Sequence, residues 1–100
     1  MPKGYLIANV DVTDPEGYKT YVAANAEAFH KFGAKFLTRG GKSEPLEGKL
    51  RSRIVVIEFP SYEAAVSCYR SPEYGKARKL RDCKSTADIV AIEGYDGAQP

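Results

Sequence analysis

The segment Arg53–Phe59 (RIVVIEF) most constrains the fold, because it is apolar on both faces of a strand. A strand with one wet face alternates apolar and polar side chains, whereas residues 54–57 are four apolar residues in a row. Pro60 and Ser61 follow at once, and this pair is typical of a strand end and a helix cap. The segment predicts a strand that is covered on two sides and carries one carboxylate, Glu58.

Periodicity and helix-capping residues predict the other elements of the chain. In chain order they are a strand at 5–12, a helix at 15–32, a strand at 35–39, a loop at 40–52, the strand at 53–59, a helix from Ser61, a further helical stretch from Pro72 to about Cys83, a strand at 87–93 and a tail at 94–100. Two start signals overlap at the first helix: Thr13 with Glu16 forms a capping box, and Asp14 precedes Pro15.

The order β-α-β-β-α-β is that of the ferredoxin-like α+β fold, with a four-stranded antiparallel sheet and helices on one face. One domain over residues 1–100 is expected from the length. The sheet face away from the helices would be open in a monomer, yet the strands at 53–59 and 87–93 offer apolar residues to it. We therefore expect a homodimer in which two copies pack sheet against sheet.

Composition limits the classes of partner. The 43% apolar and 28% charged residues are those of an ordinary globular protein, and the formal net charge of +2 is too small to favour nucleic acid or an anionic membrane. No apolar run approaches the roughly 20 residues of a membrane span, and the N-terminal segment does not read as a signal peptide. We expect a cytoplasmic protein that binds neither nucleic acid nor membrane.

Cys68, Cys83 and the single histidine, His30, offer too few ligands at too wide a spacing for a metal site, and none is expected. The two cysteines are expected to be free thiols.

His30 flanks the apolar stripe of its helix, so a surface or interface position is favoured. A general acid–base role for His30 remains the alternative.

Residues 40–43 (GGKS) end like a phosphate-binding loop, but the required preceding glycine is absent and Pro45 prevents the following helix.

Alternation places Glu58 on the face of Ile54 and Val56, and Arg39 on the face of Leu37. If the other face of the first strand lies under the helices, Asn9, Glu58 and Arg39 face the partner subunit. Burial favours the neutral form of Glu58, whereas a nearby arginine restores its charge. The carboxylate is then a general base, or it belongs to an ion pair that binds a small ligand. The alternative is that it forms a structural salt bridge that fixes the dimer.

Several separated motifs resemble the bacterial domain of unknown function 1330 over about residues 4–94. They are Arg39-Gly40-Gly41, Leu46-Glu47-Gly48, Arg53 with Val55-Val56-Ile57-Glu58-Phe59-Pro60-Ser61, and Ser71-Pro72-Glu73-Tyr74 with Arg81. The resemblance implies a ferredoxin-like dimeric α/β barrel. It also implies membership of a superfamily that contains small cofactor-free monooxygenases, lactone isomerases and stress-responsive barrels. These proteins use a cavity between sheet and helices or between subunits.

We therefore expect a small homodimer with a mostly apolar pocket for a small anionic or carbonyl-bearing metabolite. The residues expected to contact it are Asn9, Arg39, Arg53 and Tyr74, with Glu58 and His30 as candidate catalytic residues. The expected chemistry is proton transfer by Glu58 without a cofactor, in an isomerase or a cofactor-independent oxygenase. The alternative is a binding or structural module in which Glu58 and the arginines lock the dimer.

Overall fold

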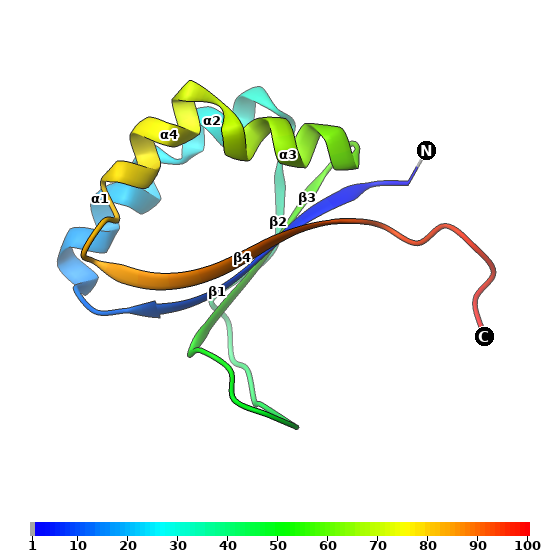
Figure 1. Ribbon diagram of the computed structural model, residues 1–100, viewed down its shortest axis with the longest axis horizontal. Coiled ribbons are helices and arrows are strands. Elements are labelled where there is room, and N and C mark those ends of the chain that lie inside the picture. The colour runs from blue at the N-terminus through cyan, green and yellow to red at the C-terminus, as the bar shows by residue number, and fades with distance from the viewer. Residues whose placement is uncertain (1) are drawn as a thin grey trace.

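The computed structural model describes residues 2–100 and confirms the ferredoxin-like α+β architecture. Its elements are β1 (Gly4–Val12), α1 (Pro15–Ala24), α2 (Ala26–Lys31), β2 (Lys35–Arg39), β3 (Arg53–Phe59), α3 (Tyr62–Arg70), α4 (Pro72–Lys79) and β4 (Ser85–Glu93). The strands form one antiparallel sheet in the order β2-β3-β1-β4. All the helices cover one face, and the loop between β2 and β3 extends away from them (Figure 1).

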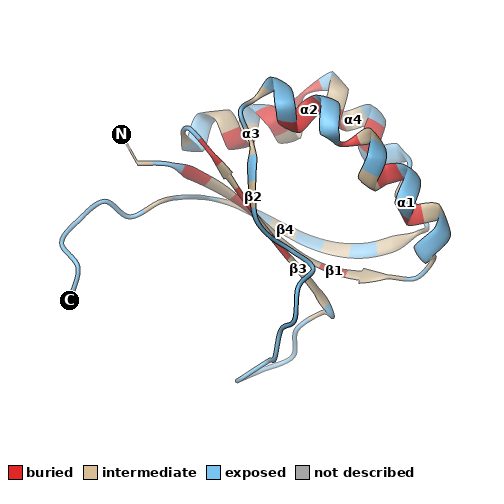
Figure 2. Ribbon diagram, turned by 180° about the vertical axis from the view of Figure 1, so that it is seen from behind, coloured by how far each residue is buried: buried red, intermediate tan, exposed pale blue. Residues whose placement is uncertain are grey.

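The strand register separates a core face from an open face. Leu6 on β1 lies opposite Ile57 on β3 and Ala91 on β4, under the helices. Its neighbour Ile7 lies opposite Val56 and Val90 on the face without helices. Buried residues lie along β1 and β3 and on the sides of the helices that face the sheet (Figure 2). The predicted two-faced apolarity of β3 is therefore confirmed, and only one of its faces is covered within the chain.

Serine and aspartate side chains start the helices. Asp14, rather than Thr13, caps α1 by accepting a hydrogen bond from the Gly17 amide at 3.1 Å. The Ser61 hydroxyl caps α3, and the Ser71 hydroxyl accepts from the Tyr74 amide at 3.1 Å to cap α4. The Ser71 cap also fixes the first turn of α4, and this places Tyr74 over the sheet.

Two helix boundaries differ from the prediction. The expected helix at 15–32 is divided at Asn25, although its hydrogen bonds continue through Asn25, which donates to Tyr21 and accepts from Phe29. Asparagine is a weak helix former because its side chain competes for backbone hydrogen bonds. The last helix ends at Lys79 and not near Cys83, whose left-handed backbone (φ +63°) cannot continue a helix.

The predicted side for Arg39 is wrong, and a bulge in β2 is the reason. Phe36 lies opposite Ile57, but Thr38 lies opposite Val56, so Leu37 is an extra residue in β2. The extra residue reverses the alternation, and Arg39 points to the helix side of the sheet, together with its partner Val55.

Candidate functional site

A small cavity lies between the sheet and the helices. Its volume is about 40 Å³, which is room for about three water molecules. Most of its lining is aliphatic or aromatic, and the polar side chains that reach it are those of Tyr18, Tyr21, Asn25, Arg39, Arg53, Tyr74 and Arg81. Residues of all four strands form its floor, and α1, α2, α4 and the turn after α4 form its roof. The mouth is on the side of Arg39, the one exposed residue in this lining.

Two buried phenols meet in this cavity. The hydroxyl oxygens of Tyr21 on α1 and Tyr74 on α4 are 2.7 Å apart, and the side chains are 7% and 2% exposed. Burial raises the pKa of both phenols above the ordinary value of 10.0. Their hydrogen bond raises the pKa of Tyr21 further but lowers that of Tyr74. Either hydroxyl can donate in this hydrogen bond, so one of the two phenolic protons is used within the pair and the other is available to a ligand.

Three arginines line the cavity without a carboxylate partner. None of the ion pairs among residues 2–100 involves Arg39, Arg53 or Arg81. Each guanidinium instead lies over an aromatic ring, 4.0 Å from Phe36 for Arg39 and 5.6 Å from Tyr21 for Arg81. The Nε atoms of Arg53 and Arg81 are buried and have no hydrogen-bond partner within this part of the chain.

A glycine sets the position of Arg53. Gly40 has a left-handed backbone (φ +77°), and a Cβ atom added to it would contact Arg53 Nη1 and would lie 2.8 Å from Cζ. The Arg53 guanidinium also lies over the Tyr18 ring, with Cζ 5.9 Å from the ring centroid. Arg53 thus lies against a side-chain-free backbone and an aromatic ring, and its Nε is buried.

Asn25 adds a buried acceptor to the same wall. The residue is 4% exposed, and its Oδ1 atom has no hydrogen-bond partner among residues 2–100. The side-chain amide of Asn25 also lies close enough to Tyr21 to act on its pKa, which it lowers against the dominant effect of burial. A buried amide oxygen without a donor costs about 1–3 kcal/mol. A ligand group that donates a hydrogen bond would remove this cost.

The lining lacks the usual bases and nucleophiles of enzymes. Among the cavity residues that the structure describes there is no aspartate, glutamate, histidine, lysine or cysteine. No group of three or more His, Cys, Asp or Glu side chains within residues 2–100 is arranged to hold a metal ion. Cys68 on α3 is buried outside this lining, and burial raises the pKa of its thiol to about 12. The site can therefore bind and stabilise oxygen anions, and it offers phenolic protons.

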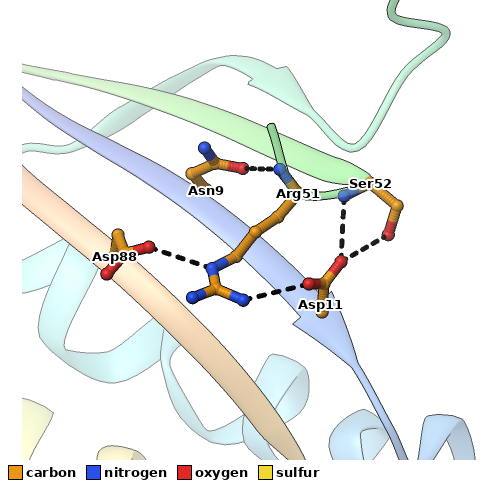
Figure 3. Close-up of polar contacts among 5 residues, drawn as sticks. All are labelled: Asn9, Asp11, Arg51, Ser52 and Asp88. Atoms are coloured by element: carbon orange, nitrogen blue, oxygen red, sulfur yellow. Dashed lines mark hydrogen bonds and ion pairs between the residues drawn. The ribbon is translucent and has the colours of Figure 1, made fainter. Parts of the chain in front are cut away.

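The open sheet face carries a different polar cluster, at the end of β1 (Figure 3). Arg51 donates to Asp11 and Asp88, both at 3.0 Å, and its backbone amide donates to Asn9 Oδ1 at 2.8 Å. The backbone amide of Ser52 and the Arg51 guanidinium hold the pKa of Asp11 below its usual value. These contacts fasten the end of the loop at 40–52 to β1 and occupy the Asn9 oxygen that was expected to contact a ligand.

The structure divides the predicted site between two faces of the sheet. Arg39, Arg53 and Tyr74 line the helix-side cavity together. Asn9 and Glu58 lie on the open face, where Glu58 Oε2 is 3.8 Å from Lys3 Nζ. His30 is exposed on α2 and lies outside the cavity lining. The expected pairing of Glu58 with Arg39 does not form, because the bulge in β2 puts Arg39 on the opposite side.

Four polar cavity residues were not singled out as site residues from the sequence: Tyr18, Tyr21, Asn25 and Arg81. Asn25 is the one with a recognisable signal. It falls at helical spacing on the stripe of Tyr18, Tyr21 and Phe29, where an amide interrupts an otherwise apolar surface. Arg81 lies just beyond the end of α4, so helical spacing alone does not show that it turns inward.

Comparison with solved structures supports the fold over nearly the whole chain. A protein of unknown function from Rhodopseudomonas palustris is 19% identical with a TM-score of 0.73, covering 96% of this chain and 85% of its own. SnoaB, a cofactor-independent oxygenase from Streptomyces nogalater, is 12% identical with a TM-score of 0.63 and 97% of each chain covered. HapK from Hahella chejuensis is 10% identical with a TM-score of 0.62, again over 97% of each chain. At these identities the likeness shows the fold alone.

Two further comparisons concern sequence and membrane association. No curated protein matches the chain. Within residues 2–100, no helix has the length and apolar character needed to cross a bilayer. The model of the domain of unknown function DUF1330 matches residues 3–95, and the chain therefore belongs to this family.

Proposed function

We propose that this chain is a small cytoplasmic protein that binds a small metabolite, through an oxygen atom, in the cavity between helices and sheet. The Tyr21–Tyr74 hydroxyl pair carries the proposal. In this proposal Tyr21 donates within the pair, and Tyr74 offers its own proton to a carbonyl or hydroxyl oxygen of the ligand. The nearby guanidinium of Arg81 adds a positive potential to the same region.

This arrangement suits chemistry that passes through an enolate and needs no metal or organic cofactor. A C–H bond next to a carbonyl breaks, its electron pair moves to the carbonyl oxygen, and Tyr74 donates a hydrogen bond to the resulting oxyanion. The proton leaves to water, because the described lining contains no carboxylate or imidazole. Return of a proton to a different carbon atom completes an isomerisation.

Oxygenation is the second reaction open to the same enolate. Dioxygen would be the oxidant: a CH₂ group becomes a carbonyl, one oxygen atom enters the product and the other leaves as water. SnoaB, which is described as a cofactor-independent oxygenase, has the same fold and supports this possibility. Both reactions depend on the first step, the stabilisation of an oxyanion by Tyr74.

Deuterium exchange into hydroxyacetone, a small neutral ketone, tests this first step. In D₂O the protein should speed loss of the α-protons over buffer, and Tyr74→Phe should remove about tenfold or more of that effect. Tyr69→Phe is the matched control, because Tyr69 packs on Tyr74 but its hydroxyl contacts Arg78 outside the cavity. Exchange no faster than in buffer, or unchanged exchange in Tyr74→Phe, would refute the proposal.

We also propose that two copies associate through the open sheet face. Its centre is apolar, with Ile7, Val56 and Val90 in one cross-strand row, and Val90 is 53% exposed. Polar residues flank this row, with Tyr5 and Glu58 at one end and the Arg51 cluster at the other. A second copy would cover the apolar centre and enclose Glu58.

Glu58 gives a second candidate role, as a lock between subunits. It lies on the open face and is paired with Lys3, outside the cavity. If Glu58 locks the dimer, Glu58→Gln should weaken association or lower the melting temperature. If Glu58 is instead a catalytic base, the same variant should stay folded and dimeric while exchange into hydroxyacetone is lost.

A further inference from the structure

We propose that the ligand of the cavity is a small 2-hydroxycarboxylate, whose carboxylate binds Arg53 and Arg81 and whose hydroxyl donates to Asn25. This inference rests on the proposed function, since it names the class of molecule that the same cavity takes. Three observations lead to it: the unpaired arginines, the unpaired amide oxygen and the size of the cavity.

The arginines require an acceptor with negative charge. Arg53 and Arg81 each bring a full positive charge to the cavity and receive no carboxylate from residues 2–100. Their Nε atoms are buried donors without acceptors. A carboxylate matches the planar fork of a guanidinium and satisfies Nε–H together with an adjacent N–H.

The amide oxygen of Asn25 requires a donor on the same ligand. An ammonium group would be repelled by the three guanidinium groups around it, including Arg39 at the mouth. A hydroxyl group donates without adding positive charge. The ligand therefore combines an anion with a neutral donor, and this combination describes a hydroxy acid rather than an amino acid.

The size of the cavity limits the rest of the molecule. About 40 Å³ admits the carboxylate and the atoms next to it but not a long or branched chain. The hydroxyl must then sit on the carbon beside the carboxylate. Phosphate also pairs with arginine in a bidentate manner, but it is bulkier than a carboxylate and brings a larger hydration cost into a small, mostly apolar cavity.

The arginine Nε–H signals in NMR spectra of the ¹⁵N-labelled protein provide the test. Glycolate should shift the signals of Arg53 and Arg81 and should bind about fivefold or more tightly than acetate, which lacks the hydroxyl. The neutral isostere glycolamide should bind at least about tenfold more weakly than glycolate. Arg53→Gln and Arg81→Gln should each weaken glycolate binding by about tenfold or more.

Two variants control for indirect effects. Arg78→Gln removes another arginine that stacks on a tyrosine, but outside the cavity, and should leave glycolate binding unchanged. Asn25→Leu should make glycolate and acetate bind equally. If Asn25→Leu does not fold, the glycolate-to-acetate ratio of the unmodified protein still tests the role of the hydroxyl.

The outcomes separate this inference from the proposed function. If glycolamide binds as tightly as glycolate, the inference that the ligand is an anion is wrong. If phosphate binds more tightly than glycolate, the inference that the anion is a carboxylate is wrong. Equal binding of acetate and glycolate would overturn the hydroxyl contact. With exchange into hydroxyacetone intact, each of these results leaves the proposed function standing, whereas loss of that exchange removes the proposed function itself.

Discussion

The hydroxyl groups of Tyr21 and Tyr74 lie 2.7 Å apart in the interior, although 53 positions separate the two residues in the chain. Tyr21 comes from α1 and Tyr74 from the first turn of α4, which the Ser71 cap holds in place. The pair joins the first and the last helix of the chain, which pack against each other, and forms the polar centre of the cavity. Stability and ligand binding are therefore linked at this one contact.

Removal of either hydroxyl leaves the other without its partner. Tyr21→Phe and Tyr74→Phe should each lower the free energy of unfolding by about 1–3 kcal/mol, because a buried hydroxyl loses its hydrogen bond. The double variant should lose less than the sum of the two. Urea denaturation of the four proteins measures this coupling. Strictly additive losses would show that the hydroxyls do not interact in solution.

The buried phenols also predict a loss of stability at alkaline pH. Burial raises the pKa of Tyr18, Tyr21 and Tyr74 above 10.0, so the folded state keeps protons that the unfolded state releases. The stability from this difference is fully present below pH 10 and is lost as the pH rises through the folded-state pKa values. Urea midpoints across this range should fall above pH 10.

Two variants distinguish the loss of stability caused by ionisation of the buried phenols from other effects of alkaline pH. The Tyr21→Phe, Tyr74→Phe double variant should lose less stability above pH 10 than the unmodified protein. Tyr95→Phe, which alters an exposed tyrosine in the tail, should behave as the unmodified protein does. An identical alkaline loss in all three proteins would contradict the assignment to the buried pair.

Gly40 and Gly48 offer a matched test of how Arg53 is positioned. Both have left-handed backbones (φ +77° and +76°), so alanine at either site costs about 1–2 kcal/mol in backbone strain. Only at Gly40 does an added Cβ also displace the Arg53 guanidinium, since the space around Gly48 is open. Gly40→Ala should therefore weaken glycolate binding as well, whereas Gly48→Ala should affect stability alone. Equal effects on binding would refute the positioning role of Gly40.

We expect the protein to form a dimer through its open sheet face, and a single charge placed on that face should disrupt the dimer. Val90→Lys introduces a cation at the apolar centre of the face and should shift the protein from dimer to monomer. Leu80→Lys, at an exposed apolar position beyond the end of α4, is the control and should leave the dimer intact. Sedimentation equilibrium over a range of concentrations measures both. A monomer in the unmodified protein would contradict the proposed dimer.

Local patterns in the sequence predicted the fold well. The two-faced apolarity of β3 and the caps at Ser61 and Ser71 depend on neighbouring residues, and all three features are confirmed. The β2 bulge left no such pattern. Nothing in the sequence of β2 marks Leu37 as an extra residue, so strict alternation put Arg39 on the wrong face.

The candidate site was only partly predictable, because its contacts join residues far apart in the chain. Arg53 and Tyr74 were among the residues expected to contact a ligand, and they do line the cavity. Glu58 stood out as an acid in an apolar strand, but its face opposes the cavity. The partners that complete the cavity, Tyr21 and Arg81, are brought in by the packing of α1 against α4 and by the turn after α4.

The most direct measurement asks which face of the sheet a bound ligand contacts. Isoleucine and valine methyl groups report on both faces, with Ile57 and Ile89 in the cavity and Ile7 and Val90 on the open face. Nuclear Overhauser contacts from the CH₂ protons of bound glycolate should reach the methyl groups of Ile57 and Ile89. Contacts confined to Ile7 and Val90 would contradict the account and would place the ligand site on the open face.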